Sequence, residues 1–355
     1  MSSLHAKEGS FVRQNSIEFS YAGNLVDQTN SNSDAKLKKV DSHNSFFGEV
    51  ENNSTISGDN TRRNLPEGNF VVDGATGSEL DRRGVDCSLP LWSANANLVA
   101  PEVLKDVHKH YLLNGAKAIT TNTFRTHENT LKKVNLGHLA KSLTQTAVEM
   151  AVQARDEVNP DALVLGCVAP LENCYRADLA HNFDTCKSEH RKIMTTLLES
   201  GCDFILIETV ASAQEAIAAA EVAQELAPGH WGIAFSLPTE TVGILRCGTK
   251  LADIIEKFKD AAFIGINCMD GRTILAQVKH LKSLVAEDMR IAAYGNIGYW
   301  VPPKEYKSGV KKNNDVEQDV IYVKCVKEWI DAGATIVGGC CGTTPDTIRM
   351  LNSVI

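Results

Sequence analysis

Short apolar runs rich in β-branched residues recur along the chain from Phe70 onward. They alternate with longer segments, such as 139–158, 213–227 and 319–333, in which apolar residues repeat at helical spacing. Continuous apolar strands that alternate with alanine-rich helices are typical of parallel sheets, whose strands are buried on both faces. The pattern predicts strands within residues 70–75, 118–124, 163–170, 204–210, 232–237, 263–269, 290–297 and 335–341.

This rhythm predicts a (β/α)8 barrel over residues 68–355, because eight β-then-α units match that fold in number and length. An open, doubly wound α/β sheet is the alternative. It usually needs fewer units and a glycine-rich phosphate-binding turn, and the segment "DGATGSEL" lacks the G-x-G-x-x-G pattern. The barrel is therefore the favoured architecture.

Residues 1–67 have a different composition. They are rich in Asn and Ser, and their apolar residues follow neither a helical nor a strand period over any length. Such a segment buries too little apolar surface to offset the entropy lost on ordering. We expect a flexible extension that precedes the barrel.

The bulk composition narrows the class of protein. With 355 residues, a formal charge of −8 and a pI near 5.7, the chain lacks the basic field that nucleic acids or anionic membranes attract. No apolar run approaches the roughly 20 residues of a membrane-spanning helix, and the start does not resemble a secretory signal. Its 10 cysteines are then expected to be reduced thiols or ligands. We expect a cytoplasmic protein.

Polar and sulfur-bearing side chains gather where the predicted strands end. In a (β/α)8 barrel the carboxyl ends of all strands lie on one face, which carries the active site. Because these residues come from separate strands, their shared position is stronger evidence than any one of them alone. They are Asp73, Asn122, Thr123, Glu208, Cys268, Asn296, Cys340 and Cys341.

Three of these residues are cysteines that could hold a metal ion. Cys340 and Cys341 follow the last strand between glycines, which let the backbone aim both sulfurs at one point. With Cys268 they offer three soft ligands to Zn²⁺ and leave the fourth tetrahedral position open, as in catalytic zinc sites. An all-sulfur set suits binding a thiolate better than activating water. The alternative is that all three are small buried apolar side chains.

The other cysteines and the histidines give weaker signals. The remaining cysteines share no spacing and are expected to be structural, although Cys167 and Cys174 flank the third strand end. No H-E-x-x-H spacing and no G-x-S-x-G turn occurs. Hydrolytic zinc or serine chemistry therefore has no support in the sequence.

Two carboxylates at strand ends are candidates for binding a cationic substrate. Glu208 follows a run of apolar residues, where a carboxylate needs a cation or several donors. A substrate ammonium is one such partner and a structural arginine is the other. Asp73 has the same choice and could instead brace a backbone turn.

Neighbouring groups could complete a pocket. The amides of Gly74, Ala75 and Thr76 open a predicted helix and could cradle a carboxylate. Thr123 could add a hydroxyl donor. Trp92 and Phe124 offer aromatic faces to a cation, and plain packing is the alternative for both rings.

Several segments resemble the homocysteine S-methyltransferase family over residues 68–355. They are "DGATGSEL", "PLWSANANLVAPEVLKDVHKHYLLNGAKAITTNTF", "APLENCYRADL", "FILIETV", "GINC" and "VGGCCGTTPDTIR". The resemblance implies a zinc-bearing barrel that methylates homocysteine to methionine. It also implies that Cys268, Cys340 and Cys341 are the zinc ligands.

The same resemblance implies roles for the substrate residues. Glu208 matches the acid that holds the homocysteine amino group, Asp73 and its neighbouring amides lie in the amino-acid pocket, and Thr123 matches a further pocket position. The mechanism that we expect is direct displacement. Zinc keeps the homocysteine sulfur as a thiolate, which attacks a methyl group held in line with it. A sulfonium donor loses its charge on transfer, so no general acid is needed.

The donor is predicted from the subtype. The segments "PLWSA" and "HKHYLLNGAKAITTNTF" resemble stand-alone members that use S-methylmethionine or S-adenosylmethionine. The sequence shows neither the long arm of betaine-using relatives nor folate- or cobalamin-binding modules, so we expect a small sulfonium donor. A betaine-using enzyme is one alternative. A zinc-containing barrel retained for binding or regulation is another, favoured by the unusual loop "YGNIGYWVPP". The sequence leaves the oligomeric state open.

Overall fold

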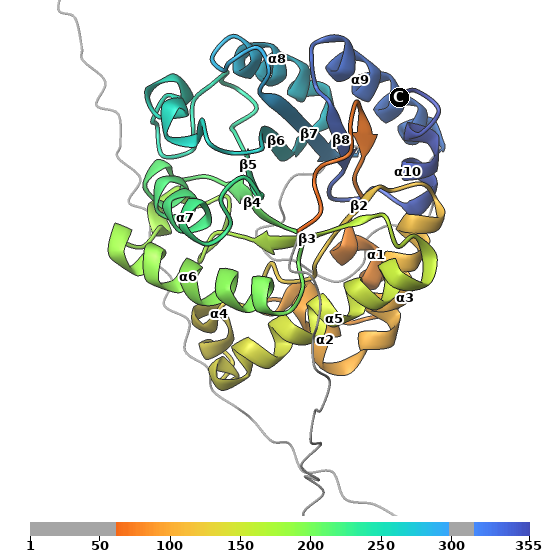
Figure 1. The fold of residues 1–355 in the computed structure, drawn as a ribbon, viewed down its shortest axis with the longest axis vertical. Helices are drawn as coiled ribbons and strands as arrows, with labels where there is room; N and C mark the ends of the chain where they lie inside the picture. Colours follow the sequence, from red (N-terminus) through yellow and green to blue (C-terminus); the bar gives the residue numbers. More distant parts are fainter. Residues whose placement is uncertain (1–61, 298–315) are drawn as a thin grey trace, which may run out of the picture. The chain divides into compact units, whose positions relative to one another are not determined.

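The computed structural model describes residues 62–297 and 316–355. Its parallel strands follow one another around a barrel, and helices surround them (Figure 1). The described strands are β1 (Phe70–Val71), β2 (Ala118–Thr120), β3 (Leu163–Val168), β4 (Phe204–Val210), β5 (Trp231–Phe235), β6 (Phe263–Asp270), β7 (Arg290–Asn296) and β8 (Ile336–Gly339). The eight strands form one sheet in the order β1-β8-β7-β6-β5-β4-β3-β2. A parallel bridge between Val72 and Ala118 closes it, so the predicted (β/α)8 barrel is confirmed.

Helices follow most strands as the sequence pattern predicts. The described helices are α1 (Thr76–Arg82), α2 (Asn95–Val99), α3 (Pro101–Leu113), α4 (Glu128–Lys132), α5 (Ala140–Val158), α6 (Phe183–Glu199), α7 (Ala213–Leu226), α8 (Gly271–Lys282), α9 (Val316–Asp331) and α10 (Pro345–Leu351). The exception follows β5, where two 3-10 turns, Leu251–Asp253 and Ile255–Phe258, replace an α-helix. Leu251, Ile255 and Phe258 are buried, so these short turns still cover the sheet.

The core has two parts because side chains alternate across each strand. One part lies between the sheet and the helices and includes Ile207, Trp231 and Val337. The other fills the barrel interior with residues such as Phe204 and Phe263. The apolar side chains fill the barrel interior, and the polar and sulfur-bearing candidates, such as Asp73, Glu208 and Cys340, lie toward the carboxyl ends of the strands.

The described residues that precede β1 are attached to the barrel. Arg63 pairs with Asp203 at 2.9 Å, just before β4, and Arg290 donates to the Pro66 carbonyl at 2.7 Å. Leu65 packs against the interior core. The predicted extension thus has barrel contacts in its last residues, while residues 1–61 lie outside the described part. The division at residue 67 stays a prediction.

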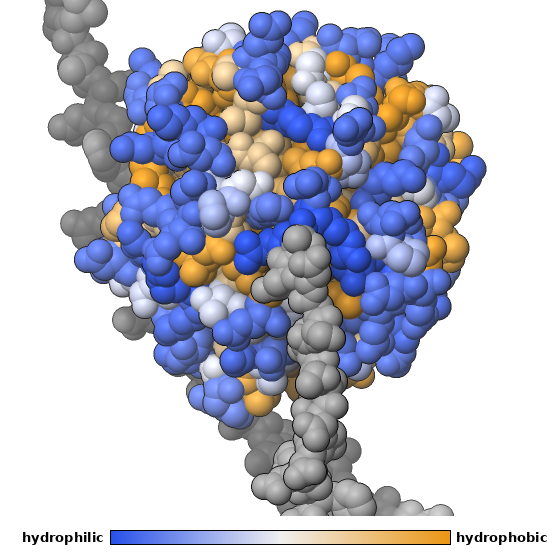
Figure 2. All heavy atoms as spheres, in the orientation of Figure 1, coloured by the Kyte–Doolittle hydropathy of each residue, from blue (hydrophilic) through white to orange (hydrophobic). Residues whose placement is uncertain are grey.

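The surface drawn in Figure 2 is chiefly hydrophilic, and hydrophobic residues occupy separate patches on it. Within residues 62–297 and 316–355, no helix is both long and apolar enough to traverse a bilayer.

Candidate metal and substrate site

The three predicted cysteines come together at the carboxyl ends of β6 and β8. The sulfurs of Cys268, Cys340 and Cys341 all lie within 4.8 Å of one another, and those of Cys268 and Cys341 are 3.9 Å apart. Cys268 and Cys341 are buried, and Cys340 is partly exposed. Three thiols at this spacing have the donor chemistry and separation that a soft divalent metal needs, so the residues fit a metal ion.

An irregularity in β6 aims Cys268 into the barrel. The pairing of β6 with β7 shifts between Asn267 and Asp270, and Cys268 has a φ of +52°. Few residues other than glycine adopt this left-handed conformation, and it concentrates at functional sites. The bulge rotates the cysteine out of the strand's regular alternation, which explains how Cys268 reaches its partners.

The turn after β8 is held by backbone contacts on both sides. The Cys340 amide donates to the Gly295 carbonyl at 2.8 Å, and the Cys341 amide donates to the Asn296 carboxamide oxygen at 3.1 Å. Gly342 has a φ of +84°, where glycine is favoured. A Cβ on Gly338 would overlap the Val72 side chain and the Asp73 backbone. These glycines therefore permit the turn and the close approach of β8 to β1.

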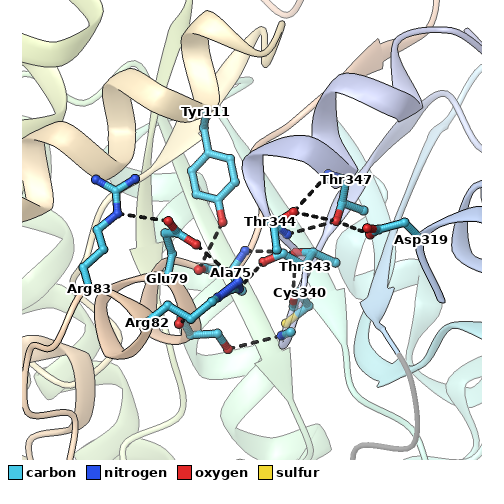
Figure 3. Close-up of polar contacts among 12 residues, drawn as sticks. Ala75, Glu79, Arg82, Arg83, Tyr111, Asp319, Cys340, Thr343, Thr344 and Thr347 are labelled. Carbon is cyan, nitrogen blue, oxygen red and sulfur yellow. Dashed lines mark hydrogen bonds and ion pairs between the residues drawn. The ribbon is translucent and has the colours of Figure 1, made fainter. Parts of the chain in front are cut away.

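Thr343 ties this turn to the start of α1 (Figure 3). Its hydroxyl donates to the Cys340 carbonyl at 2.8 Å and accepts from the Ala75 amide at 3.1 Å. Arg82 donates to the Thr343 carbonyl at 2.8 Å, and Tyr111 donates to the Ala75 carbonyl at 3.2 Å. The Ala75 amide is thus used within the protein, which does not support its predicted contact with a substrate carboxylate.

Hydrogen bonds among the cysteines shift their pKa values in opposite directions. The Tyr175 hydroxyl lies 3.0 Å from the Cys268 sulfur. Hydrogen bonds from the Cys340 and Cys341 thiols hold the pKa of Cys268 well below its usual value. The pKa of the Cys340 thiol is raised, because the thiol donates a hydrogen bond to the Cys268 sulfur. A divalent cation bound here would displace the thiol protons.

Glu208 is buried beside the cysteines at the end of β4. β4 itself carries a bulge between Ile207 and Val210, and the residue after Glu208, Thr209, has a φ of +62°. Asn267 donates to the Glu208 carboxylate at 3.1 Å. Burial raises the pKa of Glu208 to about 7, and the neighbouring Cys268 adds to the rise.

The carboxylate of Glu208 has no ion-pair partner among the Lys, Arg and His side chains that the structure describes. The structural arginine considered from the sequence is therefore not found in residues 62–297 and 316–355. Cys167 and Tyr294 also hydrogen-bond to the carboxyl, but all three partners are neutral, and a buried carboxylate favours an added cation. Glu208 is thus a buried carboxylate whose described hydrogen-bond partners are neutral side chains.

Asp73 and Thr123 make internal contacts. Thr120 donates to Asp73 from its backbone amide at 2.7 Å and from its hydroxyl at 3.0 Å, which joins β1 to β2. Burial raises the pKa of Asp73 to about 8. The Thr123 hydroxyl donates to the Cys167 carbonyl at 2.6 Å, and Thr123 is absent from the cavity wall. This position does not support a substrate contact for Thr123, whereas Asp73 lines the cavity and braces the barrel as well.

One cavity unites the other predicted residues, except Asn296, whose carboxamide supports the Cys341 amide. Its wall includes Asp73, Gly74, Ala75, Trp92, Asn122, Phe124, Cys167, Cys174, Glu208, Cys268, Cys340 and Cys341. Trp92 and Phe124 meet edge to face with ring centroids 5.6 Å apart. The two cysteines that flank the third strand end, Cys167 and Cys174, also lie in the wall.

Sequence reasoning missed two contacts of this site. Tyr175 and Asn267 stand inside the segments "APLENCYRADL" and "GINC", which carry the family resemblance, but neither had a distinguishing spacing. Tyr175 contacts Cys268 across 93 positions of sequence, and Asn267 contacts Glu208 across 59. Such long-range partners become visible only when the barrel closes.

Comparisons with known proteins agree with this geometry. A family model described as homocysteine S-methyltransferase matches residues 70–355. Homocysteine S-methyltransferase 3 of Arabidopsis thaliana is 31% identical, over 81% of this chain and 90% of that protein. Selenocysteine Se-methyltransferase of Brassica oleracea var. italica is also 31% identical, over 80% and 88%.

A solved structure is similar as well. The metallated form of the homocysteine methyltransferase MmuM from Escherichia coli superposes with a TM-score of 0.69 at 26% identity, covering 81% of this chain and 96% of that one. The family match covers the whole described barrel, including the cysteine triple and Glu208. The chain therefore belongs to the homocysteine S-methyltransferase family, enzymes that transfer a methyl group to homocysteine.

Proposed function

We propose that this enzyme transfers a methyl group from a small sulfonium donor to homocysteine whose thiol is bound to zinc at Cys268, Cys340 and Cys341. One observation carries the proposal. Three cysteine sulfurs within 4.8 Å of one another share a cavity with the buried Glu208 carboxylate, so that cavity could hold both a sulfur and an ammonium group. These are the two polar groups that distinguish an amino acid thiol.

Zinc is proposed because three thiolates are a soft ligand set of the kind that zinc accepts in tetrahedral geometry. When bound there, zinc would act as a Lewis acid that lowers the pKa of the homocysteine thiol, which is otherwise about 8.5 and mostly protonated at neutral pH. Cys340 and Cys341 are adjacent and their turn is fixed by Thr343, so the pair presents its sulfurs in one arrangement. The chain thereby supports a site with one position open to substrate.

Glu208 is proposed to orient homocysteine. Its carboxylate would accept hydrogen bonds from the substrate ammonium, and Asn267 holds the carboxylate oxygen at 3.1 Å. With its sulfur and its ammonium group both bound, homocysteine would have one orientation in the cavity. Such orientation lowers the barrier for an in-line displacement because the reacting atoms start close to contact.

The donor is proposed to lie against the aromatic wall formed by Trp92 and Phe124. Aromatic faces attract a methyl-bearing cation, and its positive charge disappears as the methyl group leaves. The donor sulfur departs as a neutral thioether, so the chemistry requires no proton donor. S-methylmethionine is proposed ahead of S-adenosylmethionine, with betaine third.

One observation that favoured a non-catalytic barrel has a structural explanation. That alternative drew on the loop "YGNIGYWVPP", in which Gly295 and Ile297 are unusual. A Cβ on Gly295 would press on the Gly271 backbone and the Ile274 side chain, so packing explains the glycine. The Ile297 amide donates to the Cys341 carbonyl at 3.0 Å, which supports the metal-site turn. Residues 298–303 of the loop lie outside the described part.

The test is methionine formation by purified protein with zinc present and the thiol kept reduced. S-methylmethionine, S-adenosylmethionine and betaine are compared at equal concentration, with homocysteine as the acceptor and selenocysteine as a second acceptor. We expect turnover of homocysteine with a sulfonium donor. Fastest turnover with betaine would overturn the donor assignment, and activity only with methylcobalamin or methyl-folate would reject the sulfonium mechanism. No methyl transfer from any donor would favour the binding or regulatory alternative.

We also propose a reducing compartment such as the cytoplasm. All 10 cysteines are free, and several are buried beside the proposed metal site. Oxidation of the triple would remove the thiolates on which the proposed chemistry depends. Activity that survives removal of reductant and exposure to oxidant would count against this setting.

A further inference from the structure

Arg125 places a cation in the cavity wall. It follows Phe124 in the loop after β2, and its side chain lines the cavity. Its Nε is buried and has no hydrogen-bond partner. Among the residues that the structure describes, no Asp or Glu forms an ion pair with its guanidinium. The buried Arg155 has such a partner in Asp203 at 3.5 Å. The half-buried Arg246 and Arg290 instead donate to backbone carbonyls.

The guanidinium is nevertheless held in place. It lies over the Phe124 ring with 5.6 Å between its central carbon and the ring centroid. Phe124 in turn meets Trp92 edge to face. A guanidinium over a ring face keeps its N–H donors, and these can bind a carboxylate through two parallel hydrogen bonds. The cavity therefore contains a positioned donor fork beside an aromatic wall.

We propose that Arg125 binds the carboxylate of the methyl donor. This inference rests on the proposed function, because that function places an amino acid sulfonium in the cavity. A partly desolvated cation without an anion is unfavourable, and the open cavity side is where an anion can reach it. S-methylmethionine and S-adenosylmethionine both carry a carboxylate, separated from the sulfonium by a short carbon chain. The aromatic wall can then face the sulfonium while Arg125 holds the other end.

The position of Arg125 favours the donor over the acceptor. In homocysteine the carboxylate is attached to the same carbon as the ammonium, so it must lie next to Glu208 if Glu208 binds that ammonium. The neighbours that shift the pKa of Glu208 are Cys167, Cys268 and Tyr294. The charge of Arg125 instead lowers the pKa values of Cys174 and His127, so Arg125 lies near those two residues. Arg125 thus belongs to the side of the cavity formed by the loops after β2 and β3.

The test compares donors with and without a carboxylate in Arg125→Gln and Arg125→Lys. For S-methylmethionine we expect KM to rise about 10- to 100-fold in Arg125→Gln, as for loss of one charge-assisted contact. Arg125→Lys keeps the charge but loses the fork, so it should restore only part of the affinity. KM for homocysteine and for trimethylsulfonium, which has no carboxylate, should stay within about twofold, a change worth under 1 kcal/mol. Arg191→Gln, which removes an exposed cation paired with Glu225, is the matched control.

Equilibrium binding separates this inference from the proposed function. Calorimetry with S-methylmethionine and no acceptor should show binding to the wild-type protein and weaker binding to Arg125→Gln. If the wild-type protein binds S-methylmethionine through Arg125 but turns over no donor, the proposed function fails and the subsite stands. Equal losses for S-methylmethionine and trimethylsulfonium, a raised homocysteine KM alone, or no wild-type binding would each overturn the inference.

Discussion

The carboxamide of Asn267 donates to the carboxylate of Glu208 at 3.1 Å, and this contact joins the strand that carries Cys268 to the strand that carries Glu208. The same carboxamide also accepts from the Thr209 amide at 3.0 Å. The contact thereby links β4 and β6, which are not neighbours in the sheet, at the point where each strand bulges. One side chain therefore links the strand of the cysteine triple to the strand of Glu208, and the proposed roles of the two can be tested separately.

Metal content tests the cysteine triple. Cys268→Ala, Cys340→Ala and Cys341→Ala should each lower bound zinc from one ion per chain to a small fraction, because two thiolates hold zinc poorly. The barrel should stay folded, since the three residues lie at strand ends outside the main core. Zinc is measured by elemental analysis of protein purified reduced and without chelator, and folding by circular dichroism. The exposed Cys247→Ala is the control. A wild-type protein free of zinc would contradict the prediction.

Homocysteine affinity tests Glu208. Glu208→Gln should weaken homocysteine binding by about 1.5–3 kcal/mol, because a charge-assisted contact is lost in a buried place. Zinc content should not change, because Glu208 is not among the clustered cysteines. Since the pKa of Glu208 is about 7, binding to the wild-type protein should strengthen from pH 6 to pH 8 as the carboxylate ionises. Titration calorimetry on both proteins checks this. Equal affinities for homocysteine would leave Glu208 with a structural role.

The same carboxyl should make the substrate-free protein less stable at high pH. Its pKa is raised from 4.5 to about 7 in the folded state, so the folded protein holds the proton more tightly than the unfolded chain. The free energy of unfolding therefore falls as the pH rises from about 4.5 to about 7, and the loss is complete above that range. Glu208→Gln should recover on the order of 1–3 kcal/mol at pH 8 and little at pH 4.5. Urea unfolding at both pH values measures the difference. A variant less stable than wild type at pH 8 would show that the Asn267 contact matters more.

The eight strands and the cysteine triple could be predicted because each leaves a local pattern in the sequence. Apolar runs give the strands, and glycines on both sides of Cys340 and Cys341 give the turn. Thr123 could not be placed in this way. β2 ends at Thr120, and the Thr123 amide then turns back to the Thr121 carbonyl at 2.8 Å, which aims the Thr123 hydroxyl at Cys167. The direction of the Thr123 hydroxyl depends on where β2 ends and on its contact with β3. The local sequence predicts neither.

Truncation tests the predicted extension. A chain that starts at residue 62 should match the full chain in activity and melting temperature, because the composition of residues 1–61 offers little apolar surface. A chain that starts at residue 68 should melt several degrees lower, since it loses the Arg63 pair with Asp203 and the packing of Leu65. Differential scanning calorimetry on the two truncations and the full chain compares them. A lower melting temperature for the chain starting at 62 would show that the preceding residues stabilise the barrel.

The donor wall gives the last prediction. Trp92 and Phe124 lie edge to face in the cavity, and we expect one ring to contact the methyl-bearing sulfonium. Each cation–π contact is worth about 0.5–2 kcal/mol, so Phe124→Leu should raise KM for S-methylmethionine roughly 2- to 30-fold and leave KM for homocysteine unchanged. Trp92 also packs on Gly77 and has a φ of +49°, so its replacement disturbs the backbone as well.

Phe124→Leu is therefore the cleaner variant, and Phe124→Tyr is its control because the ring is kept. Betaine is also a methylated cation, so loss of the ring should weaken every cationic donor. The shape of the leaving group must then decide between donors, since a thioether and a dimethylated amine differ in the room they need beside the cavity wall. We expect the wild-type order S-methylmethionine, S-adenosylmethionine, betaine to persist in Phe124→Leu at lower rates. A change in that order would mean that Phe124 selects the donor by shape, and an unchanged KM for all three would place the donor elsewhere in the cavity.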